Sequence, residues 1–151
     1  MTDTAANAAE LTPQALAEAC AAAMWADDAA TRHLGMRIEH IAPGEATISM
    51  DVAEFMLNGH GLAHGGYIFT LADSAFAFAC NGYNQRTVGH QAAITYMAPG
   101  RRGDRLTATA RELYRGKRDG IYDVSVTNGR GERIAEFRGH SRTVKGTHLP
   151  E

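Results

Sequence analysis

The chain has few of the features that mark several large protein classes. Its 151 residues include only two cysteines, Cys20 and Cys80, too few for a disulfide framework. The formal net charge is −2 and no block of like charges forms a basic arm, so we expect no nucleic-acid partner. The N-terminus lacks a basic segment followed by an apolar run, which argues against a signal peptide. These absences predict a cytoplasmic protein.

Motifs for metal, nucleotide and serine-based chemistry are also missing. His60 and His64 are spaced like a helical zinc-binding pair, but the surrounding glycines disfavour a helix and no glutamate lies between them. The glycines of GHGLAHGG do not have the spacing of a dinucleotide or phosphate-binding loop. Ser74 does not lie in a G-x-S-x-G elbow, which disfavours a serine hydrolase. We therefore expect neither a metal nor a cofactor.

What the chain does contain is a glycine- and histidine-rich loop that opens into a long apolar helix, between Met56 and Tyr83. From Gly66 to Cys80 the apolar residues fall all round the helical period, which predicts a helix buried on every side. A membrane span needs about 20 such residues, so this helix is too short to cross a bilayer and we expect no membrane contact.

One acidic residue, Asp73, interrupts the apolar helix. Burying a carboxylate costs several kcal/mol unless it is paired, so Asp73 either bonds to a neighbouring strand or serves a function. Gly65 and Gly66 stand where the helix begins, and there free N–H groups and the positive end of the helix dipole face outward. Such a helix start suits a negative charge that develops on an oxygen, which favours the functional interpretation.

The other segments predict a lead-in helix and six strands. Thr12 and Pro13 provide an N-cap and a first helical position for a helix at about 13–27, and a short second turn of helix is expected to end at Gly35. Alternating apolar and polar residues predict strands at 36–41, 46–52, 88–97, 105–114, 121–127 and 133–144. This order predicts the α+β hotdog fold, in which an antiparallel sheet of about six strands wraps around one long buried helix.

Several stretches also resemble a known family, namely NGHGLAHGG, TLADSAFAFAC, ITYMAP, GDRLTATA and GIYDVSV. Together they resemble the PaaI-like thioesterases of phenylacetate degradation, a hotdog family that acts on aromatic acyl-coenzyme A esters. The resemblance covers about residues 30–145. Its most specific part is the arrangement of Asn58, His64, Gly65, Gly66, Leu71, Ala72 and Asp73. It implies an acyl-CoA thioesterase that hydrolyses phenylacetyl-CoA or ring-hydroxylated phenylacetyl-CoA to the free acid and coenzyme A.

The expected domain organisation combines the pattern with this resemblance. We expect disorder over residues 1–10, a helical lead-in over 11–34, a hotdog thioesterase domain over 35–145 and a tail over 146–151.

The resemblance also implies roles for individual residues. The Gly65 amide would bind the thioester oxygen, Asp73 would act as nucleophile or general base, and Asn58 would place the carbonyl group or the water. Thioester hydrolysis needs an oxyanion site and an attacking or proton-accepting group, and Gly65 and Asp73 are of these two types. His64 and Ser74 complete the predicted catalytic set. His64 is expected to fix the loop by packing and hydrogen bonding, with proton transfer as its alternative role. Ser74 either holds its hydroxyl group to water or bonds back to the helix backbone.

Coenzyme A carries phosphates, so its site needs cations near the surface. Arg115, Lys117 and Arg118, with Gly116 between them, occupy the turn between two expected strands. Gly66 completes the predicted substrate-binding set. The same cations could equally be the solvated charges of an ordinary turn.

Helix geometry separates two of the predicted catalytic residues. Gly65 and Asp73 lie eight residues apart on one helix, hence about 12 Å apart along the axis and about 80° apart around it. Reacting groups must approach one carbonyl to about 3 to 3.5 Å, so both residues can serve one thioester only if Asp73 comes from a second copy. The hotdog family pairs subunits with antiparallel helices. We therefore predict a homodimer with shared active sites, paired again into a homotetramer.

Two other functions remain open. An acyl-thioester hydratase or dehydratase of the same fold would pair a catalytic histidine with the helix carboxylate, which His64 and Asp73 permit. A non-catalytic acyl-CoA-binding module would need no carboxylate in the helix, and usually brings a DNA-binding domain for which 151 residues leave no room.

Overall fold

The computed structural model of the protein describes residues 7–151. The disorder predicted for residues 1–10 falls mostly on residues 1–6, which lie outside the described part of the chain. Ala8–Glu10 form a single turn of 3₁₀ helix, η1. The side chain of Asn7 caps this turn by accepting a hydrogen bond of 3.0 Å from the Ala9 amide.

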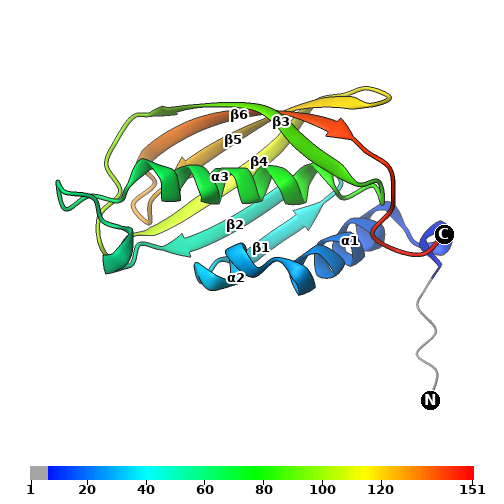
Figure 1. Ribbon diagram of the computed structural model, residues 1–151, viewed down its shortest axis with the longest axis horizontal. Coiled ribbons are helices and arrows are strands. Elements are labelled where there is room, and N and C mark those ends of the chain that lie inside the picture. The colour runs from blue at the N-terminus through cyan, green and yellow to red at the C-terminus, as the bar shows by residue number, and fades with distance from the viewer. Residues whose placement is uncertain (1–6) are drawn as a thin grey trace, which may run out of the picture.

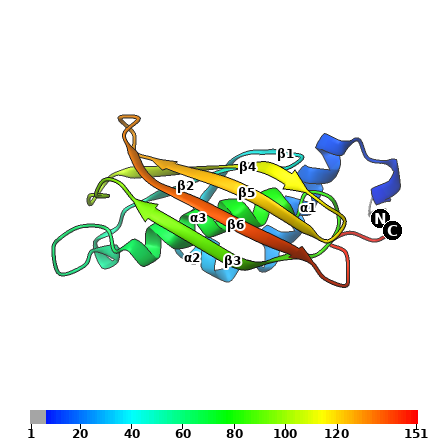
Figure 2. The same cartoon turned by 90° about the horizontal axis from the view of Figure 1, so that it is seen from above.

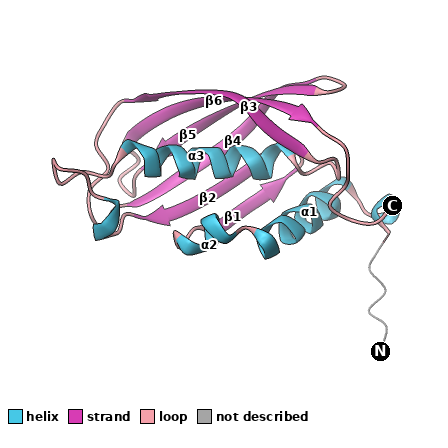
Figure 3. Ribbon diagram, viewed as in Figure 1, coloured by secondary structure: helices cyan, strands magenta, loops and turns pink. Residues whose placement is uncertain are grey.

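Six antiparallel strands form one sheet in the order β1-β2-β4-β5-β6-β3 (Figures 1 and 3). The strands are β1 (Arg37–Ala42), β2 (Glu45–Asp51), β3 (Thr87–Tyr96), β4 (Arg105–Arg115), β5 (Asp119–Thr127) and β6 (Arg133–Thr143). Figure 2 shows β1 and β3 at the two edges, with the long helix α3 beneath the sheet. The predicted α+β hotdog arrangement is confirmed.

The helix α3 (Gly65–Cys80) supplies the centre of the hydrophobic core. Its ring at Phe76 packs over two glycines of neighbouring strands, Gly89 of β3 and Gly139 of β6. A Cβ atom at either glycine would lie 2.8 Å from an atom of that ring. Because close-packed interiors do not accommodate such an overlap, only glycine lets the sheet approach the helix here.

The prediction that α3 is buried on every side is wrong. Gly66 and Asp73 are exposed, and Thr70 and Ala77 are half-buried. These four positions follow helical spacing and form one open stripe along α3. The sheet covers only part of the circumference of the helix, so small and polar residues on the remaining side stay uncovered in a single chain.

Two further helices precede the sheet. α1 (Pro13–Asp27) begins as predicted after Thr12, whose hydroxyl group accepts a hydrogen bond of 3.2 Å from the Ala15 amide. α2 (Ala29–His33) follows a cap at Asp28. The short 3₁₀ helix η2 (Glu54–Met56) leads into the loop before α3. In the described part of the chain, no helix is long and apolar enough to cross a membrane.

Candidate active site

The loop before α3 is fixed to the start of that helix by His64. His64 is the N-cap residue, and its Nδ1 accepts a hydrogen bond of 2.9 Å from the Gly66 amide. The Gly66 amide is therefore already occupied and is not free for a substrate. The imidazole satisfies one of the donors that every helix start leaves without an intrahelical partner.

The Gly65 amide, by contrast, donates no hydrogen bond to any of residues 7–151. The carbonyl oxygen of Gly65 accepts a hydrogen bond of 2.8 Å from the Tyr96 hydroxyl group, which comes from the edge strand β3. A Cβ atom at Gly65 would lie 2.9 Å from the Tyr96 ring, so the close contact requires glycine. The first amide of the helix is thus bare and its neighbouring carbonyl is held in place.

Asn58 lies beside this bare amide. Its Oδ1 accepts hydrogen bonds from the amides of His60 and Leu62, at 2.9 and 3.3 Å, and so holds the loop in shape. Within the described residues its Nδ2 has no acceptor, which leaves a donor available for a ligand. Asn58, Gly65 and Tyr96 line one cavity of about 510 Å³.

Asp73 lines a different cavity, of about 410 Å³. Asp73 as a whole residue is exposed in the single chain, but neighbouring groups partly surround its carboxyl group, and this burial raises its pKa above the ordinary value. The structure therefore brings Asn58 and Gly65 together, and it does not place Asp73 with them in the same chain.

Ser74 faces α2 instead of a substrate. Its hydroxyl group lies 3.3 Å from that of Thr31, which itself donates a hydrogen bond of 2.7 Å to the Asp28 carboxylate. Since Thr31 uses its only proton on Asp28, Ser74 must be the donor to Thr31. Neither of the two roles expected for Ser74, at a water or at its own helix backbone, describes this contact.

The basic turn between β4 and β5 lies at the other end of α3 from Gly65 (Figure 1). The Arg115 guanidinium stacks over the Tyr83 ring, 3.7 Å from its centre, just beyond the last residue of α3. Lys117 and Arg118 are exposed, and the Gly116 amide closes the turn by donating to the Asp119 carbonyl oxygen at 2.7 Å. These cations are accessible to a ligand, but not to one bound at Gly65 of the same chain.

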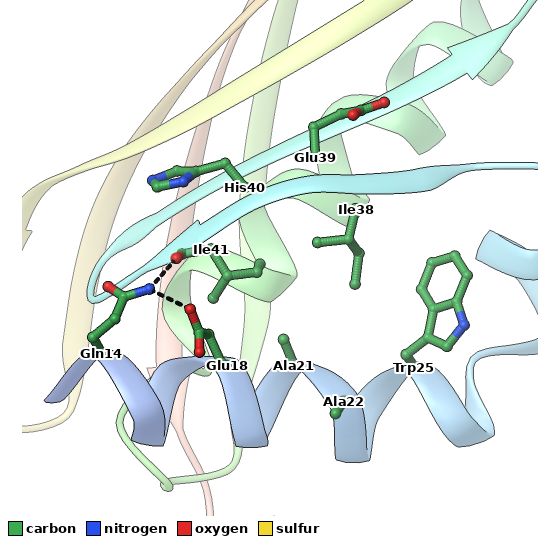
Figure 4. A pocket seen from close by; sticks show the side chains of 9 residues that line it. All are labelled: Gln14, Glu18, Ala21, Ala22, Trp25, Ile38, Glu39, His40 and Ile41. Atoms are coloured by element: carbon green, nitrogen blue, oxygen red, sulfur yellow. Dashed lines mark hydrogen bonds between the residues drawn. The ribbon is translucent and has the colours of Figure 1, made fainter. Parts of the chain in front are cut away.

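The largest of the described cavities, about 610 Å³, lies between α1 and β1 (Figure 4). Its apolar side chains include Trp25 and Ile38, and at one end Gln14 donates hydrogen bonds to Glu18 and to the Ile41 carbonyl oxygen. None of the predicted site residues lines it. Among residues 7–151, no three His, Cys, Asp or Glu side chains gather as a metal ion would require.

Sequence reasoning missed Tyr96, Arg86 and His148 as residues of these cavities. Tyr96 lies inside the ITYMAP stretch, but nothing in the sequence indicates that its hydroxyl group reaches Gly65, 31 residues away. Arg86 and His148 both line the cavity of Asp73. They come from the loop after α3 and from the expected tail, and only folding brings them together.

Comparisons with known proteins bear on the family and the fold of this chain. The sequence profile of the thioesterase superfamily matches residues 60–135. The acyl-coenzyme A thioesterase PaaI of Escherichia coli K12 is 42% identical over 125 residues, which are 83% of this chain and 89% of that protein. The structure of the E. coli PaaI protein from the phenylacetic acid degradation operon superposes with a TM-score of 0.89 and 40% identity, over 90% of this chain and 99% of the other.

A more distant structure, a hypothetical thioesterase protein from Streptococcus pneumoniae with coenzyme A, has a TM-score of 0.71 and 27% identity. It covers 74% of this chain and 90% of its own.

Proposed function

Because this chain belongs to the thioesterase superfamily, we propose that it hydrolyses phenylacetyl-CoA or ring-hydroxylated phenylacetyl-CoA to the free acid and coenzyme A. The identity of 42% to the E. coli acyl-coenzyme A thioesterase PaaI, which comes from the phenylacetic acid degradation operon, supports this substrate class. That similarity also favours hydrolysis over the hydratase and sensor alternatives. Water is the only co-substrate, no metal or cofactor is needed, and we assign the reaction to the cytoplasm.

One observation carries the mechanism: the donors and the carboxylate lie in separate cavities of one chain. Asn58 and Gly65 supply hydrogen-bond donors in the first, and Asp73 supplies a base in the second. A complete site therefore needs two copies of the chain, in which the start of one α3 faces the middle of the other.

The edge strand β3 supports pairing with a second copy. Eight of its ten residues are exposed, and no strand within residues 7–151 pairs with its outer edge. Val88 and Tyr96 on this edge are each close to half exposed. A long unpaired edge with apolar side chains is a template for another strand. Antiparallel pairing of two β3 strands would also bring the open stripes of two α3 helices together, and the small residues of the stripe permit a close approach.

In this dimer the thioester oxygen would accept hydrogen bonds from the Gly65 amide and from Asn58 Nδ2 of one copy. Both groups are fixed before the substrate arrives, because His64, Tyr96 and the backbone of the loop hold them. Preorganised donors of this kind stabilise the oxyanion that forms when the carbonyl carbon becomes tetrahedral.

Asp73 of the second copy would remove a proton from water as the water oxygen attacks the carbonyl carbon. The carbon–sulfur bond then breaks, the electron pair leaves with sulfur, and the proton passes to the thiolate of coenzyme A. In the alternative route, the carboxylate attacks directly and water then hydrolyses the mixed anhydride. A single turnover in heavy-oxygen water separates them, because only the second route leaves the label in Asp73.

The phosphates of coenzyme A would be held by Arg115, Lys117 and Arg118. These cations lie at the end of α3 that an antiparallel partner places beside its own Gly65, so they would come from the copy that supplies Asp73. Two such dimers would associate into the homotetramer.

Thiol release from a panel of acyl-CoA esters tests the function. We expect the highest kcat/KM for phenylacetyl and ring-hydroxylated phenylacetyl esters, and lower values for acetyl and long-chain esters. A protein that binds these esters without releasing coenzyme A would overturn the proposal, and so would one that adds water to an unsaturated acyl chain.

Mixed dimers test the shared site. We would combine Asp73→Ala chains with Asn58→Asp chains, because the aspartate keeps the loop-fixing oxygen and replaces the amide donor by a negatively charged oxygen, which disfavours an oxyanion. A proline at Gly65 is less suitable, since its Cβ atom would collide with Tyr96. One site of the mixed dimer then holds both lesions and the other holds none, so about half of the wild-type activity per dimer should return. Mixed dimers that form but stay inactive, or an active wild-type monomer, would refute shared sites.

A further inference from the structure

The C-terminal tail, residues 144–151, does not hang free but is fixed to the loop that follows α3 (Figure 1). Asn84, which is buried, has a side-chain oxygen that accepts hydrogen bonds from the amides of His148 and Leu149, at 3.0 and 2.8 Å. Its Nδ2 donates to the Leu149 carbonyl oxygen at 3.3 Å. Asn84 has a φ of 56°, a left-handed conformation that asparagine tolerates better than most residues.

Arg86 adds a second attachment. Its amide donates to the Gly146 carbonyl oxygen at 3.0 Å, and its carbonyl oxygen accepts from the Val144 amide at 2.8 Å. The Nε of its side chain donates to the Thr147 carbonyl oxygen at 3.2 Å. Together, Asn84 and Arg86 hold the backbone on both sides of His148.

One ring nitrogen of His148 forms a hydrogen bond, and the other forms none with any of residues 7–151. Its Nε2 lies 2.7 Å from Oδ1 of the buried Asn81. The Asn81 Nδ2 donates to two carbonyl oxygens, those of Ala77 and Thr87, so its Oδ1 is an acceptor and His148 Nε2 must be the donor. In a neutral ring Nδ1 is then an acceptor, and within residues 7–151 nothing donates to it.

The ring is neutral under ordinary conditions. Burial lowers the pKa of His148 below its usual value, and the positive charge of Arg86 lowers it further. A lone pair therefore remains on Nδ1 at neutral pH.

His148 lines the same cavity as Asp73, about 410 Å³ in volume. The other walls are largely apolar, with Met24 from α1, Phe76 from α3 and Val88 from β3. Apolar walls with a few placed polar groups are the usual composition of a small-molecule pocket. An aromatic acyl group would fit between these walls. Its thioester would lie at Asp73, and the far end of its ring would point toward the tail.

We propose that His148 is a specificity-determining residue whose Nδ1 accepts a hydrogen bond from a hydroxyl group at the far end of an aromatic acyl group. This rests on the function proposed above, because the acyl group enters the cavity only if Asp73 acts on its thioester. His148 therefore favours ring-hydroxylated phenylacetyl-CoA over phenylacetyl-CoA.

The test compares kcat/KM for para-hydroxyphenylacetyl-CoA and for phenylacetyl-CoA in three variants. In His148→Phe the ratio of the two values should fall about 3- to 10-fold, the range expected for one neutral hydrogen bond. This variant leaves Asn81 satisfied, because its Oδ1 still accepts from the Thr87 amide at 2.9 Å. His148→Gln, which keeps a donor and an acceptor, should restore most of the ratio. Asn84→Gly, which removes one of the two attachments of the tail but keeps the left-handed backbone, should lower it.

His40→Phe is the matched control, since His40 is exposed on β1 at the opposite edge of the sheet from β3. Its ratio should equal that of the wild type, and thermal unfolding should show that all variants are folded. An equal change for both esters, or an unchanged ratio in His148→Phe, would overturn the inference while the wild type remains a thioesterase. A wild type that cleaves neither ester would overturn the proposed function as well.

Discussion

The Tyr96 hydroxyl group donates a hydrogen bond of 2.8 Å to the carbonyl oxygen of Gly65. The other end of the same peptide group, the Gly66 amide, donates to His64 Nδ1 at 2.9 Å. The peptide between the two glycines is thus held at both ends by side chains. These two hydrogen bonds limit the rotation of the neighbouring Gly65 amide, which is the proposed oxyanion donor. Glycine residues without such contacts would be conformationally free.

Replacing Tyr96 by phenylalanine removes one of these two attachments and keeps the ring that packs on Gly65. We expect kcat to fall about 3- to 10-fold with KM nearly unchanged, because the Gly65 amide matters most when the oxyanion forms. Steady-state kinetics of thiol release measures both constants. Tyr114→Phe, at an exposed tyrosine of β4, is the control and should behave as the wild type. A change confined to KM would show that Tyr96 acts on substrate binding instead.

The second attachment is tested at His64. His64→Ala should lower the free energy of unfolding by about 1 kcal/mol, the usual loss for a helix N-cap, and should lower kcat as well. His64→Asn offers a side-chain oxygen to the helix start and should restore both values. Urea denaturation and thiol release measure the two effects. If the alanine variant loses activity and the asparagine variant does not regain it, the imidazole itself takes part in the chemistry.

Asp73→Asn tests the base. We expect the rate of the chemical step to fall at least about a hundredfold, as for the loss of a general base, with little change in substrate affinity. The fold should persist at neutral pH, because the substitution removes a partly buried charge that has no ion-pair partner among residues 7–151. Single-turnover kinetics measures the rate of the chemical step, and thermal unfolding shows whether the fold persists. A near-normal rate would show that Asp73 is not the base.

The pH dependence follows from the raised pKa of Asp73, which burial causes. The carboxyl group becomes protonated, and loses its function as a base, at a higher pH than an ordinary aspartate. The acid limb of the kcat profile should therefore lie above the usual aspartate pKa. For stability, a raised pKa in the folded state favours the protonated form, so this contribution is present at low pH and is lost as the pH rises through the raised value. Asp73→Asn should remove both dependences.

Periodicity was sufficient for most of the fold. Alternation and turn residues locate all six strands within two residues of their ends, and Thr12 with Pro13 marks the start of α1. The periodic pattern could not reveal the open stripe of α3, because apolar residues all round a helix do not tell which side the sheet reaches. Asp73 lies on that stripe, so its exposure was also unexpected.

The candidate site was accessible to sequence reasoning only where its groups are close along the chain. The separation of Gly65 from Asp73 follows from helix geometry alone, and the two separate cavities are consistent with it. The contacts of Ser74 with Thr31 and of Tyr96 with Gly65 join residues far apart in sequence, and no local pattern encodes them. The position of His148 likewise depends on two asparagines whose neighbours are known only after folding.

The ring of Phe76 packs so closely on Gly89 and Gly139 that the sizes of the side chains at these three positions depend on one another. During divergence a larger residue at either glycine can be accepted only with a smaller one in place of the ring, so these positions should change together among relatives. Phe76 also forms a wall of the cavity that holds Asp73. A substitution on β6, in the interior of the sheet, can therefore alter the width of this cavity during evolution without changing any residue proposed to act in the chemistry.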